Sequence, residues 1–201
     1  MDTVSTFIND PAPYVPQGLE DKNMPSFFTT YTGKWVNPLD LDPKDVCVED
    51  IAHHLAQQNR WTGATQMPIS VAQHSCIVSD IVPPEDAFDG LMHDGAEYLL
   101  QDMAKPLKSD PRLGQAYRGA EKRIERVLAP LYGINFSNPR VKRADLVALV
   151  TEARDLHHGH EHWTYYQDVP CLPITIQSWS ERKAEREFLK RFHALYDPTK
   201  I

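Results

Sequence analysis

Apolar residues recur at intervals of three and four positions along most of the chain, which is the pattern of amphipathic helices. Proline in a first turn and glycine after a last turn divide this pattern into separate helices. A short hairpin is expected at residues 27–36, because Thr32 and Gly33 suit a tight turn between strand-forming residues. The predicted helices span residues 42–57, 70–82, 85–100, 111–131, a stretch around Asp145, and 180–196.

These elements predict an all-α fold, a bundle of about six or more helices with a small N-terminal β-hairpin. A chain of 201 residues is long enough for one domain with a sizeable core. Residues 1–26 hold four prolines among polar residues, so we expect an irregular arm there. Residues 27–201 are therefore predicted to form a single domain.

Two polar side chains interrupt the apolar faces of predicted helices. His74 lies in the middle of an apolar stripe, within about 60° of Val71 and Val78 around the helix axis. Asp145 shares its face with Val141 and other apolar residues. An isolated ionised carboxylate in such a place would cost on the order of several kcal/mol. Asp145 should therefore be protonated, paired or bound to a metal.

A third predicted helix carries the pair His93-Asp94 and, one turn later, Glu97. At about 100° per residue these three side chains occupy one narrow arc. Taken alone, a buried His is more often a hydrogen-bonded core residue, and a buried Asp is more often salt-bridged. Two imidazoles and two carboxylates on three helices instead predict a site for a divalent cation, such as Mn, Co, Zn, Fe or Mg. The predicted ligands are His74, His93, Asp94 and Asp145.

The candidate ligands stand within longer motifs, which are Thr30-Tyr31-Thr32-Gly33, Glu49-Asp50-Ile51-Ala52-His53, Arg60-Trp61, Ser70-Val71-Ala72-Gln73-His74-Ser75, His93-Asp94-Gly95-Ala96-Glu97, Asp102, Lys105-Pro106-Leu107-Lys108 and Arg143-Ala144-Asp145-Leu146. These motifs resemble the HD superfamily of metal-dependent phosphohydrolases. Within it the chain is similar to the compact deoxynucleotidase branch and to short bacteriophage members, some of which are dATP triphosphohydrolases. The resemblance covers roughly residues 29–158. It implies an HD-domain helical bundle that hydrolyses deoxynucleoside phosphates.

Five residues near the ligands have expected roles in this chemistry. Glu97 lies beside the ligands and is expected to orient a water molecule or to take its proton. Asp102 could bind a further cation or serve as a proton donor. By the resemblance, Arg60 and Trp61 would contact the sugar and base, with Trp61 as a wall against a ribose 2′-hydroxyl. Pro106 would line the base pocket on the same grounds. The alternative for Trp61 is a surface tryptophan without such a role.

The net charge of −7 with neutral histidines argues against a protein that binds a nucleic acid polymer through its phosphates. A small polyanionic substrate would then need local positive groups. Arg60, Lys105 and Lys108 are the candidates nearest the ligands in sequence, and the alternative for each lysine is a solvated surface charge. The histidines in residues 157–162 follow a predicted helix end, so we expect an exposed, adventitious metal-binding run there.

Cysteine usage and hydropathy predict the compartment. Cys47, Cys76 and Cys171 form no Cys-x-x-Cys pair, so neither a disulfide framework nor a zinc ribbon is indicated. The sequence holds no apolar run long enough to span a membrane and no secretory signal pattern. We therefore expect a cytoplasmic protein without membrane attachment, located in the host cytoplasm if a phage encodes it.

Two enzymatic functions fit these residues, and one non-enzymatic function remains beside them. The first is a dNTP triphosphohydrolase that releases tripolyphosphate, with dATP as the first candidate because of the resemblance to short phage forms. The alternative is a deoxyribonucleoside 5′-monophosphatase, which needs one phosphate site and releases orthophosphate. The third is a metal- and nucleotide-binding regulator without turnover, which would not need the carboxylate of Glu97. The base preference, the native metal and the formation of a homo-oligomer stay open.

Overall fold

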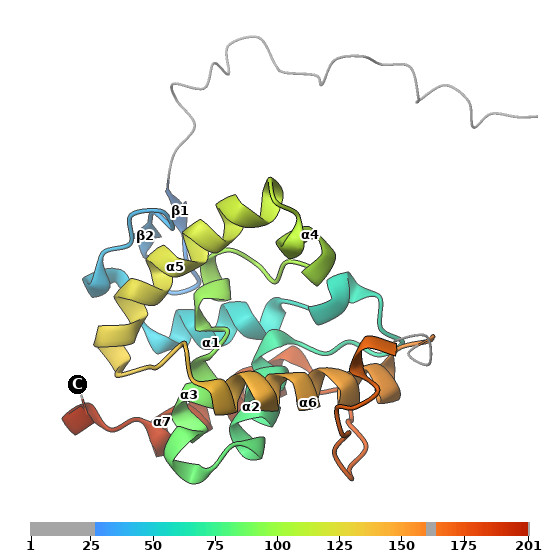
Figure 1. Cartoon of the computed structure of the whole chain (residues 1–201). Helices are drawn as coiled ribbons and strands as arrows, with labels where there is room; N and C mark the ends of the chain where they lie inside the picture. The colour runs from blue at the N-terminus through green and yellow to red at the C-terminus, as the bar shows by residue number, and fades with distance from the viewer. Residues whose placement is uncertain (1–26, 160–163, 201) are drawn as a thin grey trace, which may run out of the picture.

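A computed structural model describes residues 27–159 and 164–200 of the protein (Figure 1). Within these residues the chain forms an all-α bundle with one small antiparallel hairpin, which confirms the predicted fold class. The predicted arm at residues 1–26 lies outside the described part of the chain. The α-helices are α1 Val48–Gln57, α2 Val71–Ile81, α3 Ala87–Met92, α4 Lys105–Ser109, α5 Leu113–Tyr132, α6 Pro139–Leu156 and α7 Glu181–Leu195.

Shorter elements connect these helices. Strands β1 Phe28–Thr29 and β2 Trp35–Val36 pair antiparallel, as the turn residues around Gly33 predict. None of the described helices combines the length and the apolar character that a membrane crossing requires. The described 3-10 helices are η2 Pro43–Asp45, η3 Arg60–Gly63, η4 Pro84–Asp86, η5 Gly95–Leu99, η7 Thr164–Tyr166 and η8 Pro198–Lys200.

The core lies where α1, α2, α3, α5 and α7 meet. Helix α2 contacts α1, α3, α6 and α7, so it is the central helix of the bundle (Figure 1). Helix α6 crosses in front of α2 in this view, and its Val141, Ala144 and Ala148 pack against Val78 of α2. This packing brings the face of α6 that carries Asp145 onto the face of α2 that carries His74. The largest fully buried core side chains include Ile51, Leu55, Leu91, Met92, Ile124, Leu128 and Phe188.

Local capping residues set several of the predicted helix ends. Ser70 accepts a hydrogen bond from Gln73 N at the start of α2, and Ser180 does the same from Lys183 N at the start of α7. Gly133 ends α5 in the left-handed conformation at φ 70°, where a side chain would be strained. The sequence therefore predicts these helices to within about two residues, because their ends depend on local hydrogen bonds.

The prediction of one helix over residues 85–100 was wrong. Helix α3 ends at Met92, Asp94 leaves helical geometry at φ −97° and ψ 15°, and η5 then follows. In η5 the backbone hydrogen bonds join residues three positions apart instead of four, as in the bond that Glu97 N donates to Asp94 O at 3.0 Å. Gly90 and Gly95 give this stretch a low helix propensity, which lets the chain turn at the two predicted ligands. His93 and Glu97 therefore do not lie one turn apart on a single α-helix, as the sequence predicted.

The prediction of one helix over residues 42–57 was also too long. The single turn of η2 is followed by Val46 and Cys47 in extended conformation, and α1 begins at Val48. The side chain of Asp42 accepts a hydrogen bond from Lys44 N, and Pro43 suits the first turn of a helix. These two residues therefore start only the short helix η2, since the chain is extended again at Val46.

A buried carboxylate attaches the hairpin to α1. Asp50 accepts hydrogen bonds from Thr30 Oγ1 at 2.8 Å, Thr32 N at 2.7 Å, Thr32 Oγ1 at 2.9 Å and Cys47 Sγ at 3.1 Å. These donors hold the pKa of Asp50 below its usual value although burial opposes the shift. Asp50 thereby ties Thr30 and Thr32 of the hairpin to α1 through three hydrogen bonds.

Replacement of this carboxylate should weaken the fold without disturbing the metal ligands. Asp50→Ala leaves the buried Thr30 hydroxyl without an acceptor, so we expect the free energy of unfolding to fall by about 2–3 kcal/mol. Urea denaturation measures this change. Glu49→Ala, an exposed change on the same helix, is the control and should shift stability by less than about 0.5 kcal/mol. Equal effects of the two variants would contradict the attachment.

Candidate metal centre

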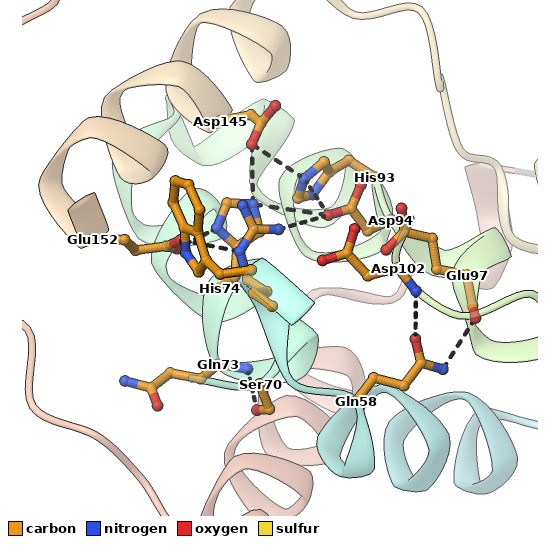
Figure 2. A network of polar contacts seen from close by, with 12 residues as sticks. Gln58, Ser70, Gln73, His74, His93, Asp94, Glu97, Asp102, Asp145 and Glu152 are labelled. Atoms are coloured by element: carbon orange, nitrogen blue, oxygen red, sulfur yellow. Dashed lines mark hydrogen bonds and ion pairs between the residues drawn. The ribbon is translucent and has the colours of Figure 1, made fainter. Parts of the chain in front are cut away.

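His74, His93 and Asp145 come together from three segments of the bundle (Figure 2). His74 is on α2, His93 directly follows α3, and Asp145 is on α6. One ligand-capable atom of each lies within 4.8 Å of the others, and these three residues could hold a metal ion. His74 Nε2 lies 3.0 Å and His93 Nε2 lies 4.0 Å from Asp145 Oδ1. The structure thus brings together three of the four predicted ligands as one cluster.

The hydrogen bonds of the two imidazoles fit metal binding. His93 Nδ1 donates to Gly90 O at 2.8 Å, and His74 Nδ1 donates to Glu152 Oε1 at 2.5 Å. When a ring is neutral, these bonds keep its proton on Nδ1 and leave the lone pair of Nε2 for a ligand. Both Nε2 atoms are buried, and the carboxylate oxygens nearest to them belong to Asp145, 3.0 Å from His74, and to Asp94, 3.1 Å from His93. A cation shared by these nitrogens and oxygens would satisfy all of them.

Asp94, the fourth predicted ligand, lies against the same cluster. Its Oδ2 is 3.1 Å from His93 Nε2, 3.8 Å from His74 Nε2 and 3.6 Å from Arg60 Nη1. Burial alone would raise the pKa of Asp94, but the charges of His93, His74 and Arg60 outweigh burial and hold the pKa below its usual range. Asp94 is thus an anionic oxygen donor beside both imidazoles, and its coordination of a metal stays a prediction.

Glu152 belongs to the site, although the residues predicted for the site did not include it. It is fully buried, and in addition to His74 it accepts from Arg60 Nε at 3.0 Å and Trp61 Nε1 at 3.2 Å. A signal for it exists in the sequence, because Glu152 follows Asp145 by two helical turns and points within about 20° of it. Figure 2 shows Glu152 and Asp145 at different nitrogens of the His74 ring, Glu152 at Nδ1 and Asp145 at Nε2.

The buried charges make the cluster attractive to cations. Burial and the charge of Arg60 lower the pKa of His74, but Glu152 and Asp145 outweigh both and raise it to about 9. Burial raises the pKa of Glu152, yet Arg60 and His74 bring it below its usual value. Glu152, Asp94 and Asp145 therefore stay ionised, and the positive charge they require comes from Arg60 and from a proton or a cation at His74.

The cluster borders a cavity of about 920 Å³, which falls within the size range of small-molecule sites. Asp94 and Asp145 reach this cavity from the metal cluster. All seven predicted catalytic and substrate-binding residues lie on its wall. They are Arg60, Trp61, Glu97, Asp102, Lys105, Pro106 and Lys108, and the wall also includes Met103, Leu149, Arg118, Tyr165 and Tyr166.

Glu97 is placed beside the cluster rather than in it. Its Oε1 lies 3.4 Å from Lys108 Nζ, and its buried Oε2 has no hydrogen-bond partner among the described residues. Burial and the charges of Asp94 and Asp102 raise the pKa of Glu97 well above its usual value. Burial likewise raises the pKa of Asp102. The cavity therefore holds two carboxyl groups whose raised pKa values favour the protonated form more than in an exposed carboxyl group.

The predicted cationic residues already have partners on the cavity wall. Lys108 Nζ lies 2.5 Å from Glu121 Oε1, in addition to its contact with Glu97. Lys105 Nζ donates to Tyr166 Oη at 2.9 Å and lies over the ring of that tyrosine. Arg60 is buried and forms an ion pair with Glu152, so its guanidinium group contacts the cavity wall itself.

Trp61 takes an unusual backbone conformation at the cavity. Trp61 and Thr62 have φ values of 60° and 53°, in the left-handed region that non-glycine residues rarely enter. Such residues cost about 1–3 kcal/mol each and occur where surrounding contacts hold them. Here the hydrogen bond from the indole of Trp61 to Glu152 supplies one such contact.

Other histidines have separate partners. His53 Nδ1 lies 3.1 Å from Glu185 and stacks on Tyr31, and His54 Nδ1 donates to Tyr98 O at 2.9 Å. The predicted adventitious run begins at His157, whose ring lies 5.5 Å from that of Trp61. His160 and His162 fall outside the described residues, so the arrangement of the run stays a prediction.

Comparison with known proteins identifies relatives but no family model that matches the chain. The uncharacterized protein YfdR of Escherichia coli is 35% identical over 174 residues, which cover 85% of this chain and 96% of YfdR. An uncharacterized protein of Rhodobacter capsulatus is 32% identical over 139 residues, which cover 62% of this chain and 70% of that protein.

Removal of one ligand should remove the metal. Asp145→Ala deletes the oxygen that faces both Nε2 atoms, so we expect the purified variant to carry no divalent metal. His157→Ala combined with His158→Ala, outside the cluster, is the control and should keep about one metal ion per chain. Elemental analysis measures both. Full occupancy in Asp145→Ala would refute the ligand assignment.

Glu152 should control metal affinity without touching the metal. Glu152→Gln weakens the acceptor that orients His74, so the dissociation constant for metal should rise by about 10–100-fold. Competition with a chelator measures the constant. Glu181→Gln, an exposed change at the start of α7, is the control and should leave it unchanged. Wild-type affinity in Glu152→Gln would show that this hydrogen bond does not orient the ligand.

Proposed function

The chain belongs to the family of the Escherichia coli protein YfdR, and from the chemistry of its site we propose that it is a metal-dependent phosphohydrolase of deoxynucleotides. One observation carries the proposal. Two buried imidazoles turn their Nε2 atoms toward the carboxylates of Asp145 and Asp94, beside a cavity that is also lined by Glu97. The Oε2 atom of Glu97 has no hydrogen-bond partner among the described residues. A cation site beside a carboxyl group that can exchange a proton with water is an arrangement suited to metal-assisted hydrolysis.

The protein groups divide into cation binding and proton transfer. His74, His93, Asp94 and Asp145 would hold the cation, which when bound acidifies water and polarises a phosphate. Glu97 would orient the attacking water and take its proton, because its free Oε2 faces no competing donor among the described residues. The raised pKa of Glu97 makes its carboxylate a stronger base than an exposed glutamate.

Asp102 and the basic side chains would serve the leaving group and the phosphates. Asp102 lines the same cavity, and its raised pKa suits donation of a proton to the departing deoxynucleoside oxygen. Lys105 and Lys108 lie on the wall where they would bind phosphate oxygens, Lys108 by exchanging one carboxylate partner for the substrate. Trp61 and Pro106 would contact the sugar and base.

The cavity supports a triphosphate as substrate. About 920 Å³ is near the upper end of small-molecule sites, and Lys105, Lys108 and Arg118 all line it. A single phosphate would not require three cationic side chains in addition to the metal cluster. The proposed activity is therefore a dNTP triphosphohydrolase that releases tripolyphosphate, with dATP as the first substrate to test.

Product analysis tests the activity directly. The wild-type protein is incubated with each dNTP and dNMP, and with ATP and AMP, in the presence of Mn²⁺, Co²⁺, Mg²⁺, Zn²⁺ or Fe²⁺, and the products are identified by mass. Tripolyphosphate and a deoxynucleoside are expected from dATP, with less product from ATP because Trp61 would exclude the 2′-hydroxyl. Orthophosphate from dNMPs alone would establish a 5′-monophosphatase instead. Nucleotide binding without any product would indicate a regulator and overturn the proposal.

Glu97 should be essential for turnover and dispensable for the metal. Glu97→Gln keeps the size of the side chain and removes the base, so kcat should fall by about 10²-fold or more. Metal content, measured on the same sample, should stay at the wild-type level because Glu97 is not in the His74 cluster. Glu181→Gln, at the exposed start of α7, is the control. Loss of metal would make Glu97 a ligand, and full activity would place water activation elsewhere.

A further inference from the structure

Gln58 lies at the end of α1 and contacts the backbone of both proposed proton-transfer residues (Figure 2). Its Nε2 donates to Glu97 O at 3.0 Å, and its Oε1 accepts from Asp102 N at 3.1 Å. The side chain is only 4% exposed, so these bonds are made away from competing water. Gln58 is not among the residues predicted to bind the metal or the substrate.

The segment between Glu97 and Asp102 has little regular structure of its own. The 3-10 helix η5 ends at Leu99, and Gln101 adopts the left-handed conformation at φ 71°. Glu97 O also accepts from Leu100 N at 3.0 Å and Gln101 N at 2.9 Å, so this carbonyl is held from three sides. The amide of Asp102 donates to Gln58 and thereby closes the segment against α1.

The backbone beside Gln58 is in turn attached to the helix that carries His74. Gln58 O accepts from Val71 N at 3.0 Å, and Arg60 N donates to Ile69 O at 2.9 Å. Asn59 and Ser70 form an isolated antiparallel bridge between these two bonds. Ser70 is the N-cap of α2, which places His74 one turn into the helix. Gln58 therefore connects the start of α2 to the segment from Glu97 to Asp102.

We propose that Gln58 is a positioning residue that holds Glu97 and Asp102 in place relative to His74. A primary amide suits this task because it ends in one donor and one acceptor, and the two partners are a carbonyl and an N–H. A carboxylate lacks the donor, and an aliphatic side chain lacks both. The inference rests on the proposed roles of Glu97 and Asp102 in proton transfer, where displacements of about 1 Å cost activity.

Gln58→Met tests the proposal, because methionine fills a similar volume and makes neither hydrogen bond. We expect kcat for the substrate found by product analysis to fall by about 10–10²-fold, with metal content and KM close to wild type. Hydrogen exchange at the Asp102 amide should become faster, since that amide loses its acceptor. Gln57→Met is the matched control, because Gln57 is the exposed neighbour on the same helix and has no bond to this segment.

Several outcomes would overturn the proposal. Unchanged exchange at Asp102 would show that Gln58 does not hold the segment, and unchanged kcat with faster exchange would show that its position does not matter for turnover. Parallel losses of metal and kcat would make Gln58 a structural residue of the whole site. If Gln58→Met does not fold, Gln58→Asn gives the same readouts, because its shorter amide cannot reach both partners. If the wild type hydrolyses no nucleotide, the proposed function fails, and exchange at Asp102 alone decides whether Gln58 holds this segment.

Discussion

The hydrogen bond from His74 to Glu152 joins two fully buried side chains on α2 and α6 at 2.5 Å. It places the proton of His74 on Nδ1 and leaves Nε2 directed at Asp145 and Asp94. The same carboxylate accepts from Arg60 and Trp61, which form part of the cavity wall. One side chain thus orients a metal ligand and two cavity residues. A different rotamer of Glu152 would leave His74 free to turn and would leave Arg60 buried without its closest carboxylate.

Such a site is expensive to bury, and its composition explains why it favours cations. Removing each ion from water costs on the order of several kcal/mol. Only close opposite charges and complete hydrogen bonding can offset that cost. Glu152, Asp94 and Asp145 contribute three negative charges, whereas Arg60 is the one permanent positive charge in contact with them among the described residues. His74 supplies a second positive charge when it is protonated, and the surrounding carboxylates favour this form by raising its pKa to about 9. A divalent cation meets the same electrostatic demand and would stabilise the folded chain by binding it preferentially.

Irregular backbone surrounds the cavity, while regular helices carry the fixed ligands. His74 and Asp145 sit within α2 and α6, whose packed apolar faces hold them rigidly. By contrast, the chain turns at His93-Asp94. The described non-glycine residues with positive φ are Trp61, Thr62 and Gln101, and they lie on segments that border the cavity. Left-handed conformations of this kind persist only where other contacts hold them. The bonds of Trp61 to Glu152 and of Asp102 to Gln58 are contacts of that kind, and they link the irregular segments to the helical core.

The sequence by itself determined the helical class, the extents of α2, α5 and α7, and the inward direction of His74 and Asp145. These features follow from periodicity and from caps such as Ser70 and Gly133, which act over one or two turns. Only the tertiary structure decided that Glu152 holds His74 and that Gln58 joins Glu97 to Asp102. Those contacts join residues far apart in the chain, and their geometry depends on how α2, α6 and α1 pack. A helical projection gives the direction of a side chain around its own axis, but it holds no information on the distance to another helix.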